Sequence, residues 1–390
     1  MRKLTFILLI LFGKALYCQE IPLRTNEGGG GLFLDVDYIW RYNLYEHSRW
    51  GLGLAYNADS ARIWRVVLNA GYGLYDKQLK WGLGASCLLD SSRMGSLYVM
   101  ATRGYSAVGN RFMHWRSITD LSGLASFMSM RMSDQRSAIV GYRWITGHSS
   151  FMADVRLFFG GRLFDNNGLL YRKDGDTIAP ENGVELRFGF GFGGFAVEAL
   201  LGRTWPAHKP IAQLLAEYDI TLHNSLFETR CYLQAGITPP NTPYIYMFDL
   251  GGTSGSFLYF RNSLLTVLPC EYSANSFVMA SLRIKADQPL FSTWNSLFVV
   301  GSNPKPFVGV NAAWGHIWGQ DADGRIHYEN LDLRSPSDGF AELVVGVDGL
   351  LRWGVVDNGI AFAVRLHPWE TKPLWAVLLT AELNPSTTNR

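Results

Sequence analysis

The chain has 390 residues and a formal net charge of +2, with Lys and Arg scattered rather than clustered, so no nucleic-acid partner is indicated. Charged residues make up 17% of the sequence, below the roughly 25% typical of soluble domains. No segment after position 18 has the about 18 consecutive apolar residues that a membrane-spanning helix needs. Such a composition favours strands in which only alternate residues are apolar.

The N-terminus has the layout of a secretory signal peptide. Positions 1–3 form a short basic region, positions 4–12 are apolar, and a candidate cleavage site lies between Cys18 and Gln19. Cleavage there would leave 372 residues (390 minus 18). Acylation of Cys18 stays open as an alternative, although Tyr17 is bulky where a small residue is expected. We therefore expect an exported protein with a signal peptide at 1–18 and a periplasmic lead-in at 19–30.

Candidate strands follow one another along the rest of the chain. They are 31–41, 49–58, 61–75, 78–90, 95–104, 137–147, 149–162, 183–193, 194–204, 211–222, 226–237, 273–286, 304–316, 338–349, 352–366 and 374–384. Sixteen is an even number, and many of the lengths suit a tilted bilayer crossing of about 9–11 residues. The sequence thus predicts an all-β fold, a transmembrane antiparallel β-barrel of about 16 strands over 31–384, with a polar tail at 385–390.

Strict alternation within the strands predicts which face meets lipid. In 183–193, Val184, Leu186 and Phe188 share one face, while Glu185 and Arg187 share the other. The same pattern recurs in five other strands and yields ten candidate lumen-facing charges. They are Asp154, Arg156, Glu185, Arg187, Glu217, Asp219, Arg283, Lys285, Glu342 and Asp348. Two interpretations remain open, a paired network that stiffens the barrel and a conducting path.

Aromatic residues cluster at the ends of the early strands. We predict that they form girdles at the membrane interfaces. They are Trp40, Tyr42, Trp50, Tyr56, Tyr72, Tyr75 and Trp81.

The connections alternate in length. Long odd-numbered connections at 105–136, 163–182, 238–272 and 317–337 alternate with mostly short even-numbered ones, as expected for outer loops and periplasmic turns. The exception is the long even connection 287–303, where either a short helix is present or the strand count is wrong by a hairpin.

Nothing in the sequence indicates catalysis. His148 beside Ser149 and Ser150 is the nearest approach to a serine triad, and a tight turn explains it better. The segment 321–324 has part of a calcium-loop pattern but lacks its closing Glu, which favours a solvated turn. Cysteines 87, 231 and 270 are odd in number and widely spaced. We expect no enzyme, no cofactor, and no catalytic or metal-binding residues.

Three stretches carry a family resemblance: 71–82 (GYGLYDKQLKWG), 271–291 (from Glu-Tyr to Pro-Leu-Phe) and 339–351 (GFAELVVGVDGLL). They resemble a Bacteroidetes outer-membrane barrel family of unknown function, whose members often carry an N-terminal carboxypeptidase-regulatory-like domain. That family is similar in turn to the superfamily of BamA-type assembly barrels and two-partner-secretion transporters.

The superfamily resemblance implies sixteen strands and a long sixth outer loop tucked into the lumen. The connection 238–272 stands where that loop belongs, with five strands after it, and its candidate inward residues are Gly251, Gly252 and Arg261. This sequence departs from the superfamily in lacking the Arg-Gly tip motif, for which Arg261 is the candidate substitute. The periplasmic domains that receive substrates are not among the expected segments.

The resemblance implies an integral outer-membrane barrel that acts in envelope biogenesis or in protein transport and assembly, without catalysis. A passive pore or solute uptake channel is the first alternative, and a surface scaffold or adhesin is the second. The expected partners are outer-membrane lipid and, as an open question, periplasmic or outer-membrane proteins.

Overall fold

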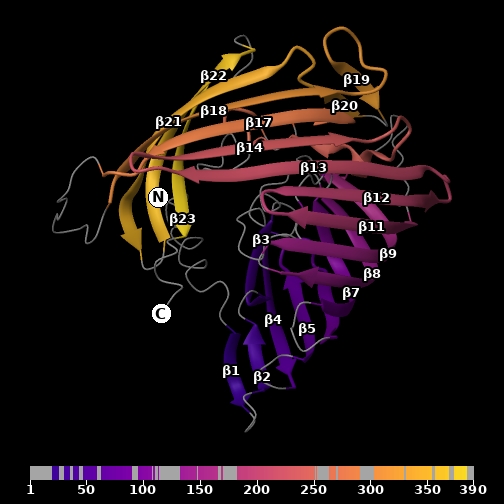
Figure 1. Ribbon diagram of the computed structural model, residues 1–390. Coiled ribbons are helices and arrows are strands. Elements are labelled where there is room, and N and C mark those ends of the chain that lie inside the picture. Colours follow the sequence, from indigo (N-terminus) through magenta and orange to yellow (C-terminus); the bar gives the residue numbers. More distant parts are fainter. Residues whose placement is uncertain are drawn as a thin grey trace. The chain divides into compact units, whose positions relative to one another are not determined.

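The structure is a computed structural model of the whole chain, drawn in Figure 1. It describes residues 20–25, 30–35, 38–43, 47–58, 63–89, 95–107, 109, 113, 132–146, 148–165, 168–169, 182–250, 252, 263–268, 271–289, 303–328, 331–353, 356–368 and 373–383. The predicted signal peptide, Cys18, Cys270 and the polar tail lie outside these residues. No helix within the described residues is long and apolar enough to span a membrane.

The chain forms two compact units, and each is described by itself. The first contains β1 (Glu20–Thr25), β2 (Gly31–Asp35), β3 (Trp40–Asn43), β4 (His47–Asn57), β5 (Trp64–Gly73), β6 (Leu79–Leu88), β7 (Gly95–Ala107), β8 (Met132–Ile145), β9 (Ser149–Asp165), β10 (Gly168–Leu169), β11 (Asn182–Phe192) and most of β12 (Phe195–Trp205). From β4 to β9, each strand pairs antiparallel with the next in the chain, and β9 pairs with β11. Figure 1 shows β4 to β9 side by side.

The second unit contains most of β13 (Pro210–His223), then β14 (Phe227–Ile237), a short 3-10 helix η2 (Tyr244–Tyr246), β15 (Phe248–Asp249), β16 (Ser273–Ala274), β17 (Ser276–Ala286), β18 (Lys305–His316), β19 (Arg325–Tyr328), β20 (Leu331–Arg334), β21 (Phe340–Trp353), β22 (Val356–His367) and β23 (Trp375–Leu383). Its long strands pair antiparallel in the order β13, β14, β17, β18, β21, β22, β23. The pairs β15–β16 and β19–β20 are separate two-stranded sheets in the connections.

All sixteen predicted segments contain strands, and the prediction of an all-β antiparallel fold is confirmed. The main sheet counts 19 strands because of three additions. The segment 31–41 is two strands, β2 and β3, which both pair with β4. The two-residue β10 pairs with the last residues of β9. The strand β1 lies within the predicted lead-in 19–30 and pairs with β2. The lead-in prediction missed β1 because the strand has only six residues and contains Pro22.

The long connection 287–303 does not hide a missing hairpin. The strands on either side of it, β17 and β18, pair directly over ten positions from Ser276↔His316 to Lys285↔Phe307. The strand count is therefore right at this point. The alternative of a short helix concerns positions 290–302, which lie outside the described residues.

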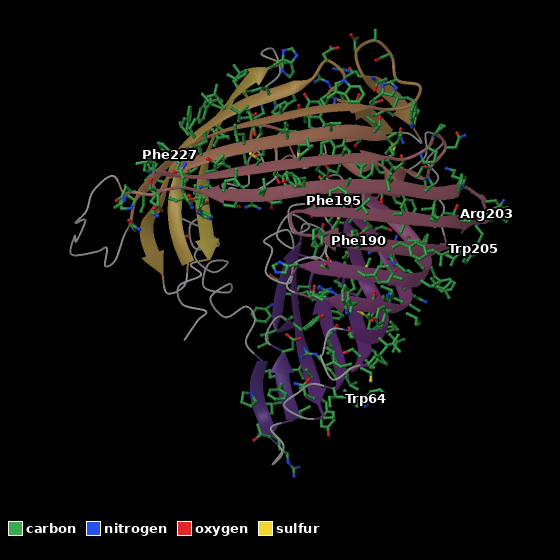
Figure 2. All side chains as sticks on the ribbon, viewed as in Figure 1. Trp64, Phe190, Phe195, Arg203, Trp205 and Phe227 are labelled. Carbon is green, nitrogen blue, oxygen red and sulfur yellow. The ribbon has the colours of Figure 1, made fainter. Side chains whose placement is uncertain are left out.

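The two faces of the strands differ as the alternation predicts. On β11, Leu186, Phe188 and Phe190 are 40%, 46% and 48% exposed, while Glu185, directly before them, is 1% exposed. Trp64 and Phe190 are labelled among the side chains of the first unit in Figure 2. We call the exposed side of the strands the apolar face and the other side the polar face.

The exposed aromatic residues lie toward both ends of their strands. Trp50 pairs with Tyr72 at one end of the β4–β5 ladder, while Tyr56 and Trp64 lie toward the other end. Tyr72 lies eight positions after Trp64, about 26 Å along an extended strand, which is of the order of a membrane's apolar band of about 25 Å. Tyr75 and Trp81 are exposed as well, whereas the side chains of Trp40 and Tyr42 lie outside the description.

In the second unit, the polar face of the strands is covered by an aromatic core near Gly236. The rings of Phe248 and Phe277 pack edge to face with centroids 4.8 Å apart. A Cβ on Gly236 would lie 2.6 Å from both rings, which only glycine avoids. Through these two rings, β15, which lies inside the connection 238–272, packs against β17.

Replacing Gly236 by Val is expected to destabilise the fold. Overpacking of this kind costs about 1–3 kcal/mol, because Phe248 and Phe277 must both move. Urea unfolding in detergent micelles, followed by tryptophan fluorescence, measures the loss. The matched control is Ala235→Val, on the opposite face of β14, for which we expect a change within about 0.5 kcal/mol. Equal midpoints for the two variants would contradict the packing described.

Candidate functional site: a loop docked on the polar face

The ten predicted lumen charges all lie on the polar face, and each is buried or partly buried. In the first unit, four of them come together on β9 and β11. Arg156 lies 3.3 Å from the Glu185 carboxylate and donates to Gln135 at 2.6 Å. Arg187 lies 3.8 Å from Glu198 and 4.0 Å from Glu185. Asp154 accepts a hydrogen bond of 3.0 Å from the Tyr98 hydroxyl.

In the second unit, the predicted charges form separate pairs. Asp219 is bonded to Arg230, and Lys285 lies 3.3 Å from Glu228. Arg283 is bonded to Asp348, which also accepts from Thr380 at 2.7 Å. Glu217 accepts a 3.4 Å bond from Tyr232. The pairs Asp219–Arg230 and Lys285–Glu228 join neighbouring strands, where opposite charges stabilise the ladder. Arg283 on β17 instead reaches past β18 to Asp348 on β21. All three pairs agree with the network interpretation, while the question of a conducting path stays open.

Glu342 differs from the other nine residues because it holds a loop. The residues 263–268, which we call the docked loop, lie against the polar face of β18, β21 and β22, and all except Leu268 are buried. The Glu342 carboxylate accepts from the backbone amides of Leu265 and Thr266 and from the Thr266 hydroxyl, each at 2.8 Å. A fourth bond of 2.7 Å comes from the Asn311 side chain. Glu342 itself is fully buried.

Arg365 on β22 is a second fixed point of the docked loop. Its guanidinium donates to the Thr266 carbonyl and lies 3.5 Å from the Glu271 carboxylate, and the residue is fully buried. Glu271 accepts from the Leu268 amide at 2.8 Å, closing the far end of the loop. Sequence analysis missed Arg365, although a single charge inside the apolar stretch 360–366 was an available signal.

Apolar contacts complete the docking. Leu265 belongs to a buried cluster with residues contributed by β18, β21, β22 and β23: Phe307, Val344, Ala361, Ala363, Ala376 and Leu378. Tyr272, just after the loop, packs edge to face on Phe340 with centroids 6.2 Å apart. Burial, together with the nearby Glu271 carboxylate, raises the pKa of Tyr272, so this phenol stays neutral.

The predicted inward residues are only partly placed. Gly251 and Arg261 lie outside the described residues, and Gly252 forms an isolated parallel bridge with Leu264 of the docked loop. A Cβ on Gly252 would lie 2.1 Å from the Leu268 carbonyl oxygen. The role of Arg261 therefore stays a prediction, while Gly252 lets the two arms of the connection approach closely.

The predicted turns contain ordinary turn chemistry. Asp321 accepts from the amides of Asp323 and Arg325 at 3.0 and 2.8 Å, and the Thr146 hydroxyl accepts from the Ser149 amide at 2.8 Å beside His148. Within the described part of the chain, no three His, Cys, Asp or Glu side chains are grouped as metal ligands would be.

The family-like hairpin 71–82 is held by Asp76. Its carboxylate accepts from Lys80 at 2.6 Å and from the Tyr105 hydroxyl at 2.9 Å, and it caps the turn through the Gln78 amide at 3.2 Å. The Lys80 ammonium also lies 4.3 Å from the Tyr105 ring centroid. The motif thus fastens the β5–β6 turn to β7.

Solved structures with a similar fold are outer-membrane barrels. BamA from Haemophilus ducreyi, crystallised without POTRA domains 1–3, matches over 92% of this chain and 71% of its own, with a TM-score of 0.52 and 12% identity. CdiB from Escherichia coli matches over 87% of this chain and 60% of its own, with a TM-score of 0.50 and 11% identity. The fold is that of an outer-membrane β-barrel. No family model and no curated protein sequence matches the chain.

These matches differ from the chain in length. A third structure, CdiB from Acinetobacter baumannii, matches over 86% of this chain, with a TM-score of 0.46 and 11% identity. The match spans only 57% of the length of that CdiB chain. At such identities the likeness concerns the fold alone.

Proposed function

We propose that the chain is an integral outer-membrane protein of the BamA-like type, acting in envelope biogenesis or protein transport without catalysis of its own. The observation that carries this proposal is the docked loop with its clamp on Glu342 and Arg365. The proposal places outer-membrane lipid on the apolar face and leaves the protein partners to be found. Membership of the Bacteroidetes barrel family and cleavage of a signal peptide belong to the same proposal.

The clamp suits a loop with two stable positions. The bonds from the Leu265 and Thr266 amides to the buried Glu342 carboxylate stabilise the docked position of the loop. If the loop leaves, water or another donor can take the place of each amide at the carboxylate. The docked loop is short, and the amides of Leu265 and Thr266 hold it at one carboxylate. Release would open the polar face of β18, β21 and β22 together, as in a transition between discrete packings.

Planar-bilayer conductance separates a gated transporter from a passive pore. We expect the wild-type protein to be mostly closed and Glu342→Ala to show long, large openings. The matched control is Asp219→Asn, which changes another polar-face carboxylate whose bonded partner is Arg230 and not the loop. A large, steady conductance that is the same in all three proteins would favour the passive pore.

A cellular experiment tests the role in biogenesis. In a strain lacking the gene, we expect a defined set of outer-membrane or exported proteins to be depleted, and the wild-type gene to restore them. The Glu342→Ala gene is expected to restore them poorly, and the Asp219→Asn gene fully. An unchanged membrane proteome combined with slower uptake of a small solute would overturn the proposal in favour of a channel.

A further inference from the structure

Glu342 and Arg365 face each other across two neighbouring strands. In the β21–β22 ladder, Glu342 is the register partner of Arg365, and both residues are fully buried. Directly opposite residues on one face of an antiparallel pair have Cβ atoms about 4.5–5.5 Å apart, a separation that a carboxylate and a guanidinium easily bridge. Yet no ion pair joins Glu342 to Arg365 among the residues that the structure describes.

Other opposite charges at directly opposing positions do pair. In the first unit, Arg156 and Glu185 are register partners on β9 and β11, and their charged groups lie 3.3 Å apart. In the second unit, Glu228 and Lys285 are register partners on β14 and β17, also with charged groups 3.3 Å apart. The separation of the two charges on β21 and β22 therefore has a local cause.

Thr266 of the docked loop is bonded to both charges. Its amide and its hydroxyl donate to the Glu342 carboxylate at 2.8 Å each, and its carbonyl accepts from the Arg365 guanidinium. This one loop residue thus takes up hydrogen-bonding groups that the two wall residues would otherwise offer to each other.

The docked arrangement leaves Arg365 incompletely bonded. Within the described part of the chain, its Nε and Nη1 atoms have no hydrogen-bond partner, and neither has Oε1 of Glu271, which lies 3.5 Å from Nη1. A guanidinium can make two parallel bonds to one carboxylate. The Glu342 carboxylate, directly opposite, would supply such acceptors once the loop has left.

We propose that Glu342 and Arg365 exchange partners when the docked loop leaves, and bond to each other across β21 and β22. The exchange stabilises the released position, because neither buried charge is then left without a partner, which would be costly. Two discrete positions of one element require a set of contacts for each. This inference rests on the proposed function, which supplies the release of the loop, and it assigns the residues that set the balance between the two positions.

Reversing both charges separates the two positions of the loop. The double variant Glu342→Arg/Arg365→Glu keeps an opposite pair across the strands, but it places a cation against the loop amides and a carboxylate against the Thr266 carbonyl. Each single reversal is expected to lower the folding equilibrium constant about 100-fold or more, since like charges then face each other in a buried ladder. In urea unfolding in micelles, the double variant should recover most of that loss, and its residues 265–266 should exchange hydrogen at the rate of a free loop.

The matched control is the double variant Glu228→Lys/Lys285→Glu, which reverses a register pair on β14 and β17. We expect it to unfold at a urea concentration near that of the wild type and to keep slow exchange at residues 265–266. If Glu342→Arg/Arg365→Glu unfolds as easily as the single reversals while the control is stable, the partner exchange is overturned. Slow exchange at residues 265–266 in Glu342→Arg/Arg365→Glu would overturn it as well.

Thr266→Pro tests the exchange without altering either charge. Proline has neither an amide N–H nor a hydroxyl, so two of the four bonds to the Glu342 carboxylate are lost from the loop side. We expect the loop to be released and the loss of stability to be smaller than in Glu342→Ala, because the two charges left behind bond to each other. A loss as large as that of Glu342→Ala would count against the pairing.

Planar-bilayer conductance separates this inference from the proposed function. A Glu342→Arg/Arg365→Glu protein that folds with a free loop and shows the long openings expected of Glu342→Ala would support both. The same protein with a free loop and the conductance of the wild type would support the partner exchange and contradict the gated transporter.

Discussion

Replacing Glu342 by Ala is expected to release the docked loop and to destabilise the second unit by about 3–5 kcal/mol, the range for removing one partner of a buried charged contact. The four donors of the clamp would lose their acceptor together: two backbone amides, the Thr266 hydroxyl and the Asn311 side chain. Buried donors without acceptors cost about 1–3 kcal/mol each. Glu342→Gln keeps one acceptor oxygen at the same place, so we expect an intermediate loss.

Hydrogen exchange measured by mass spectrometry detects release of the docked loop at the amides of the loop itself. In the wild type, the amides of Leu265 and Thr266 should exchange slowly, and in Glu342→Ala they should exchange at the rate of a free loop. Asp219→Asn is the control, because its partner Arg230 is on β14 and not in the loop. Rapid exchange of residues 265–266 already in the wild type would show that the clamp does not hold in solution.

Replacing Phe188 by Arg is expected to impair membrane assembly. Phe188 lies in the middle of β11 opposite Ala153, with a side chain 46% exposed on the apolar face. An Arg facing lipid near the bilayer midplane costs about 2–4 kcal/mol. Folding into phosphatidylcholine vesicles, followed by gel mobility without heating, measures the assembled fraction.

Two variants on the same strand serve as controls. Phe188→Leu keeps an apolar side chain and should assemble normally. Glu185→Gln changes the polar face, where the carboxamide oxygen can still accept from Arg156, and should be far milder than Phe188→Arg. If Glu185→Gln and Phe188→Arg impair assembly equally, the assignment of the two faces is wrong.

Much of the fold can be predicted because apolar and polar side chains alternate every two residues in a strand that has lipid on one face and a polar interior on the other. The pattern of Val184 to Phe192 shows both the strand and its exposed face, and six of the sixteen predicted segments carry such an alternation. Boundaries were less certain, since β8 begins at Met132 rather than 137. The strand β1 was missed because Glu20–Thr25 is short and contains Pro22, beside which its pairing with β2 shifts register.

The docked loop could not be predicted in the same way. Its main bonds to Glu342 come from backbone amides, which every residue except proline has, so no residue type marks Leu265 and Thr266 as the partners. The sequence could place Glu342 on the polar face but not say what it would bind. The prediction for Arg261 lies outside the described residues, and the sequence offered no reason to expect that Arg365 on β22 would donate to the Thr266 carbonyl.

Site-directed spin labelling along 184–192 tests the central claim most directly. Single cysteines are introduced one at a time into a chain whose native cysteines are replaced by serine, and each labelled protein is folded into vesicles. Labels at 186, 188 and 190 should collide freely with oxygen dissolved in the acyl chains and little with a polar nickel complex, while labels at 185, 187 and 189 should not show this preference. Free access of the nickel complex to 186, 188 and 190 would contradict a lipid-facing apolar side.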